Sequence, residues 1–200
     1  MARTTVTTDM LKDLAVATAK LADLAVTTAK LAAGSVTSAK LAQGAPITLA
    51  AQQVTTSGTV FDFAVPAGVK RITVMFKGVS ISGTDNLLVQ LGDAGGFETS
   101  GYLSESGGMN NGAGSSVATS TAGFISQAGG AGGVVSGTMT LSLMDAATFS
   151  WVSAHNTRQS STLTSAGSGE KALSAELTQV RVTRTGTDTF DAGAIGLSYE

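Results

Sequence analysis

The segment KRITVMFKG (70–78) places Ile72, Val74 and Phe76 at every second position. Successive side chains of a β-strand point to opposite faces, so these three residues would line one face of a sheet. The period of two therefore predicts a strand with one side turned toward a core.

The same period recurs from residue 61 to residue 199. The apolar positions that follow it are Phe61, Phe63 and Val65; Leu87, Val89 and Leu91; Met139, Leu141 and Leu143; Phe149 and Trp151; Val180 and Val182; and Ile195, Leu197 and Tyr199. Turn sequences rich in glycine, serine and aspartate lie between them, for example at 82–85 and 92–96. This pattern predicts a mainly β fold over residues 46–200, an antiparallel β-sandwich that is jelly-roll-like.

The first 45 residues follow a different period. Four blocks of ten read VTTDMLKDLA (6–15), VATAKLADLA (16–25), VTTAKLAAGS (26–35) and VTSAKLAQGA (36–45). Ten residues miss whole turns of a continuous α-helix by about 80°, so the Val and Leu positions would not form one stripe. The A-K-L-A part favours helix and the V-T-T part favours extended backbone. We expect a shaft of short helices and extended links; a β-solenoid and a disordered alanine-rich linker are the alternatives.

A single repeat strand has too little apolar surface to fold alone. Several chains wound around one axis would bury the apolar residues that recur in register, which are Val16, Leu21, Val26, Leu31, Val36 and Leu41. The sequence therefore predicts that residues 1–45 oligomerise and that residues 46–200 form a separate domain.

Residues 92–137 are rich in glycine, serine and alanine. A stretch of this length without regular structure is unusual inside a compact domain. We expect either exposed loops around a short strand at 123–125, or small side chains that pack where copies of the chain meet.

Composition excludes several functional classes. Only 13% of residues are charged, the net charge is -2 and neither half is strongly basic, which argues against nucleic-acid binding. The chain has no cysteine and one histidine, so thiolate and His-rich metal sites are excluded within one chain. MARTTVTTDM (1–10) lacks the apolar core of a signal peptide, and no apolar run approaches the roughly 18 residues of a membrane span. We expect synthesis in the cytoplasm without membrane insertion.

No catalytic or cofactor motif is present. The phosphate-loop pattern G-x-x-x-x-G-K-[ST] and the nucleophile-elbow pattern G-x-S-x-G are both absent, and no cofactor is expected. The aromatic and polar residues that we consider for receptor contact are Tyr102, Trp151, His155, Asn156 and Arg158. For Trp151 a place in the core is the plainer interpretation.

Two parts of the chain resemble bacteriophage structural proteins. The V-T-T-A-K-L-A repeats resemble those of phage tail and head fibre proteins. VPAGVKRITVMFKGVSISGTDNLLVQLGDAGGFETSGY (65–102) and LTQVRVTRTGTDTFDAGAIGLSYE (177–200) resemble a domain that recurs in such proteins. The resemblance implies a homotrimeric virion fibre that attaches to the capsid or tail through its N-terminus. It implies no catalytic residues.

Three functions follow as hypotheses. The first is a structural fibre whose β-domain adheres to a host glycan or protein. The second is a virion depolymerase, which needs paired acids in a groove and aromatics for sugar stacking; aromatics are only 5%, so we expect no enzyme. The third is a capsid decoration protein that stabilises the shell without binding a host.

Overall fold

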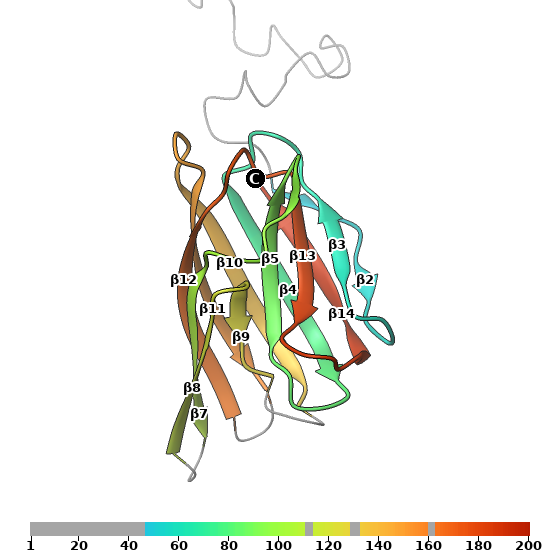
Figure 1. Cartoon of the computed structure of the whole chain (residues 1–200). Coiled ribbons are helices and arrows are strands. Elements are labelled where there is room, and N and C mark those ends of the chain that lie inside the picture. Colours follow the sequence, from blue (N-terminus) through green and yellow to red (C-terminus); the bar gives the residue numbers. More distant parts are fainter. Residues whose placement is uncertain (1–46, 111–113, 129–132, 160–162) are drawn as a thin grey trace, which may run out of the picture. The chain divides into compact units, whose positions relative to one another are not determined.

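The computed structural model describes residues 47–110, 114–128, 133–159 and 163–200 (Figure 1). The decapeptide repeats and the six residues expected to oligomerise lie outside these ranges. The chain divides into two units, Met1–Ala45 and Pro46–Glu200, and all described strands belong to the second.

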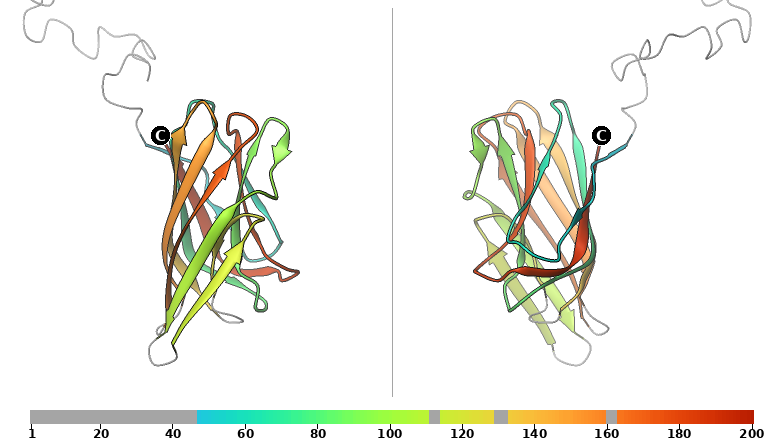
Figure 2. Two further views of the ribbon diagram at one scale, coloured as in Figure 1. Left: turned by 60° about the vertical axis from the view of Figure 1, so that its left-hand side comes forward. Right: turned by 90° about the vertical axis from the view of Figure 1, so that its right-hand side faces the viewer.

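The described part of the chain contains strands and no helix, arranged in two antiparallel sheets (Figure 1, Figure 2). The large sheet has nine strands in the order β1-β14-β4-β10-β11-β12-β7-β8, with β2 also paired to β14. Their bounds are β1 Thr48–Leu49, β2 Gln53–Val54, β4 Arg71–Ile81, β7 Leu103–Asn110, β8 Gly114–Ser120, β10 Val135–Asp145, β11 Ser150–Arg158, β12 Leu163–Ala172 and β14 Phe190–Tyr199.

The small sheet has five strands in the order β3-β13-β5-β6, with β9 also paired to β5. Their bounds are β3 Phe61–Ala64, β5 Leu87–Asp93, β6 Gly96–Phe97, β9 Phe124–Ser126 and β13 Gln179–Arg184. In the described residues, therefore, no helix has the length and apolar character needed to cross a membrane.

The segment KRITVMFKG (70–78) lies in β4 from Arg71 onward, between β14 and β10 in the large sheet. Ile72 and Val74 are fully buried, as the alternation predicts. The two sheets meet in one apolar core, where Phe61 of β3 packs edge-on against Phe190 of β14 with ring centroids 5.0 Å apart. The expectation of a mainly β, antiparallel, two-sheet domain is confirmed.

The inner face of the large sheet changes character from one side to the other. Residues directly opposite each other on neighbouring strands share a face. One such row runs Leu197, Val74, Met139, His155, Gly167, Ser106, Ala118. The half formed by β14, β4 and β10 is apolar, whereas β12, β7 and β8, and β11 apart from Trp151, present mostly small or polar side chains.

The small side chains are explained by the close approach of β9. A Cβ on Gly169 would lie 2.9 Å from Cδ1 of Phe124, and one on Gly108 would lie 2.6 Å from Oε1 of Gln127. A Cβ on Gly167 would lie 2.5 Å from Cε1 of His155. Glycine at positions 108 and 169 lets residues 124–128 approach the sheet closely, and glycine at position 167 leaves room for the ring of His155 on the neighbouring strand β11.

The structure corrects the interpretation of residues 92–137. The short strand expected at 123–125 corresponds to β9. The other described residues of this stretch do not form the expected long loops, because they include β6, β7, β8 and the start of β10. Of the small residues in this stretch, Gly108 packs against Gln127 of the same chain. β7, β8 and β12 were not predicted from the sequence, because glycine and serine occupy most of their inner positions and produce no apolar alternation.

This packing predicts a sharp difference between two glycine substitutions. Gly167→Ala places its Cβ against the carbonyl oxygen of Glu105 and the ring of His155, and should lower the unfolding free energy by about 1–3 kcal/mol. Gly107→Ala on the outer face meets its nearest atom, the carbonyl oxygen of Ala166, at 3.7 Å. That control should change stability by less than about 0.5 kcal/mol in urea unfolding. Equal effects would contradict the close contact of Gly167 with β7 and His155.

Candidate binding groove

A groove of about 600 Å³ lies over β11, β12, β7 and the end of β8 in the large sheet. The residues that line it are Tyr102, Leu103, Ser104, Glu105, Thr119, Ser120, Thr121, Val152, Ser153, Ser168, Gly169 and Glu170. Because strands present alternate residues to alternate faces, the exposed members of this set share the outer face of the sheet.

Two transverse rows of side chains shape the groove. One row runs Val152, Glu170, Leu103, and the next runs Ala154, Ser168, Glu105, Thr119. Small side chains in the middle of the second row leave the hollow between larger neighbours. Among the described residues that line the groove, Glu105 and Glu170 are the only charged ones, so both charges are acidic. The arrangement offers carboxylate and hydroxyl groups beside the exposed apolar side chain of Leu103.

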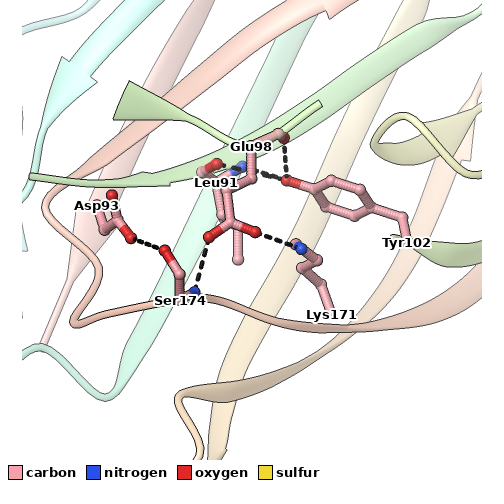
Figure 3. A network of polar contacts seen from close by, with 6 residues as sticks. All are labelled: Leu91, Asp93, Glu98, Tyr102, Lys171 and Ser174. Atoms are coloured by element: carbon pink, nitrogen blue, oxygen red, sulfur yellow. Dashed lines mark hydrogen bonds and ion pairs between the residues drawn. The ribbon is translucent and has the colours of Figure 1, made fainter. Parts of the chain in front are cut away.

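Tyr102 ties the start of β7 to β5 behind the groove (Figure 3). Its hydroxyl accepts a hydrogen bond from the backbone N–H of Leu91 at 2.7 Å and donates one to the carbonyl oxygen of Glu98 at 3.0 Å. Its ring packs edge-on against Phe124 at a centroid distance of 5.1 Å. Burial raises the pKa of the Tyr102 hydroxyl, which therefore stays protonated as a donor.

An ion pair between buried Lys171 and partly exposed Glu98 continues this network (Figure 3). Lys171, only 7% exposed, pairs with Glu98, and its Nζ lies 5.4 Å from the centre of the Tyr102 ring. Ser174 donates from its backbone N–H to Glu98 at 2.7 Å and from its hydroxyl to Asp93 at 2.5 Å. Burial acts to raise the pKa of Glu98, but the contacts with Lys171 and Ser174 outweigh it and lower the pKa. The network fixes the end of β12, next to Glu170 of the groove.

A buried serine–histidine contact lies on the inner side of the same strands. Oγ of Ser106 and Nε2 of His155 are 3.0 Å apart, and both residues are buried. Ser106 Oγ also accepts a hydrogen bond from the backbone N–H of Gln127 at 3.2 Å, and Gln127 Nε2 donates to the Ser106 carbonyl at 2.7 Å. Burial lowers the pKa of His155 to about 4. The buried pair anchors residues 124–128 and offers no accessible nucleophile.

The structure does not bring together the five residues considered for receptor contact. Tyr102, Trp151 and His155 lie in the interior, at 0%, 2% and 6% exposure. Asn156 and Arg158 are exposed on the opposite face of β11. Of the five, only Tyr102 lines the groove. The plainer interpretation of Trp151 as a core residue agrees with the structure.

Aromatic residues could not reveal the groove, because its exposed lining side chains are aliphatic, hydroxyl or carboxylate groups. Leu103, Glu105, Ser168 and Glu170 stand in segments whose glycine and serine content hid the strands. The detectable signal was Leu103 and Glu105 at alternate positions, separated by a small serine.

Among the described residues, no group of three or more His, Asp or Glu side chains is placed to hold a metal ion. Comparison of the chain with protein-family models, curated proteins and solved structures gave no match.

The burial of His155 predicts an acid-sensitive fold. The unfolded chain takes up a proton near pH 6.5, whereas the folded chain does so only near pH 4, so stability should fall as pH drops between these values. The loss attributable to His155 should be about 1–3 kcal/mol. His155→Gln keeps a polar partner for Ser106 and should remove this dependence of the unfolding free energy on pH. Urea unfolding at pH 7, 6 and 5 measures the unfolding free energy. If it falls equally with pH in the variant and the wild type, His155 is not the cause.

Proposed function

We propose that this chain is a structural fibre protein of a bacteriophage virion, homotrimeric, with residues 1–45 as the shaft that attaches to the tail or capsid. In this proposal, residues 46–200 form a jelly-roll-like distal domain that adheres to the host surface. The observation that carries adhesion is the groove of about 600 Å³ on the outer face of the large sheet. The resemblance of the repeats to phage fibre shafts supports the trimeric fibre and the role of residues 1–45 as its shaft.

The lining of the groove favours a neutral or amino-substituted glycan as its ligand. Carboxylates and hydroxyls form hydrogen bonds with sugar hydroxyls, and Leu103 and Val152 offer apolar contact to the C–H face of a ring. Glu105 and Glu170 would repel uronate, sialate or phosphate groups. With no exposed aromatic among the described lining residues, each site should bind weakly. Several copies on one particle would raise the avidity without new contacts.

Filling the groove should abolish glycan binding. Ser168 lies in the middle of the groove row, and Ser168→Trp occupies the space that a sugar ring would take. Thr138→Trp is the matched control, because Thr138 is an exposed hydroxyl residue on β10 and does not line the groove. Retention of the purified full-length chain on immobilised neutral glucan, amino-sugar polymer and polyuronate measures binding.

The proposal expects at least about tenfold weaker retention of Ser168→Trp on the neutral or amino polymer, a loss of about 1.4 kcal/mol, and normal retention of the control. Absence of binding to every polymer by the wild type favours the capsid decoration alternative. Release of reducing ends would contradict the adhesive proposal and favour a depolymerase that uses the two glutamates.

The shaft makes a separate prediction. If Leu21 and Leu31 meet near a threefold axis, Leu21→Asp together with Leu31→Asp would bury charges there at a cost of several kcal/mol per chain, about the cost of burying an unpaired charge. Mass measurement in solution should show three chains for the wild type and a smaller species for the double variant. A wild-type mass of one chain, or a variant that assembles as before, would contradict the inward placement.

A further inference from the structure

Among the described strands, the large sheet ends in β8 at one side and in residues 48–54 at the other. β8, labelled in Figure 1, is the last strand at its side, and β1 and β2 pair with β14 at the other. In the part of the chain that the structure describes, no strand pairs with the outer edge of β8. Such an edge presents a row of backbone N–H and C=O groups that match another strand.

β8 lacks the features that usually protect an edge strand from pairing. No Asp, Glu, Lys, Arg, His or Pro occurs anywhere in residues 106–144. β8 pairs with β7 without a bulge from Gly114 to Ser120. Val117 on β8 and Met109 on β7 are 69% and 59% exposed. Charges, prolines and bulges normally block edge-to-edge association, so this edge is unprotected.

The opposite edge also lacks charged residues and exposes apolar side chains. Residues 48–55 follow β14, with Thr48 and Leu49 opposite Tyr199 and Ser198, and the backbone N–H of Ala50 donates to Leu197 at 2.8 Å. Leu49 and Val54 are 71% and 62% exposed.

The exposed apolar residues of both edges lie on the same face of the sheet. The row through Leu49 runs Leu49, Ser198, Thr73, Thr140, Ala154, Ser168, Glu105, Thr119. Thr119 and Val117 are two residues apart on β8, so Val117 shares the outer face with Leu49. A sheet that continued from one copy of the chain to the next would place Val117 beside Leu49 or Val54.

Strand direction permits this continuation. Every neighbouring pair along the eight-strand path from β1 to β8 is antiparallel, so β1 and β8 run in opposite directions. A second copy rotated about an axis parallel to the strands would present its residues 48–54 antiparallel to β8, as in the rest of the sheet.

We propose that β8 pairs with the edge formed by residues 48–54 of a second copy of this chain, so that the large sheets join head to tail. A head-to-tail contact repeated around a rotation axis closes into a ring and leaves no free edge. This interface lies in the β-domain and is separate from the shaft contacts of the proposed function.

Disulfide cross-linking of the full-length chain tests the interface, because the native chain has no cysteine. Leu49 and Val117 lie at opposite ends of the eight-strand path, whose seven spacings of about 4.8 Å add up to about 34 Å along the sheet. An intrachain disulfide cannot span this distance. Leu49→Cys with Val117→Cys, and Val54→Cys with Val117→Cys, should therefore form interchain disulfides under mild oxidation in at least one pair.

The controls separate this interface from other contacts. Leu49→Cys with Met144→Cys uses a residue that is 68% exposed on an interior strand and should give no cross-link. Cross-linking by Val117→Cys alone would indicate β8 paired with β8 and would overturn the proposal. A wild-type chain that is monomeric by mass would also overturn it. An oligomer without either designed cross-link would overturn the β8 contact and leave the shaft as the site of assembly.

Discussion

The close contact between residues 124–128 and the glycine- and serine-lined face of β12 and β7 is the constraint on which the domain depends. It allows a five-stranded sheet to cover a nine-stranded one. The backbone N–H groups of Ile125 and Gln127 donate to the hydroxyls of Ser104 and Ser106, at 3.0 and 3.2 Å. Buried polar groups that find partners in this way specify one register, because any shift would leave them unsatisfied.

The same contact explains why the opposite face carries the groove. Inner positions of β7 and β12 are occupied by small residues against β9, so their larger side chains, including Leu103, Glu105 and Glu170, lie on the outer face. The buried network of Tyr102, Glu98 and Lys171 then holds the ends of both strands. A ligand would meet side chains carried by fixed strands, which lowers the ordering cost of binding.

Apolar alternation predicted the strands whose inner positions face the apolar half of the core. Ile72, Val74, Leu141 and Val180 illustrate this, because their burial follows directly from a period of two. Alternation failed for β7, β8 and β12, because residues 124–128 pack close to their inner faces and leave room only for small side chains or for none, as at Gly108 and Gly169. The groove was not predicted for the same reason, because most of its side chains are carried by those strands.

Native-state hydrogen exchange at the backbone N–H groups of Ile125 and Gln127 tests the central role of this contact most directly. If residues 124–128 hold the two sheets together, these amides should exchange only through global unfolding, with the same opening free energy as Val74 in β4 and the same dependence on urea. Exchange through a local opening at a much lower free energy, while β4 stays protected, would contradict the account.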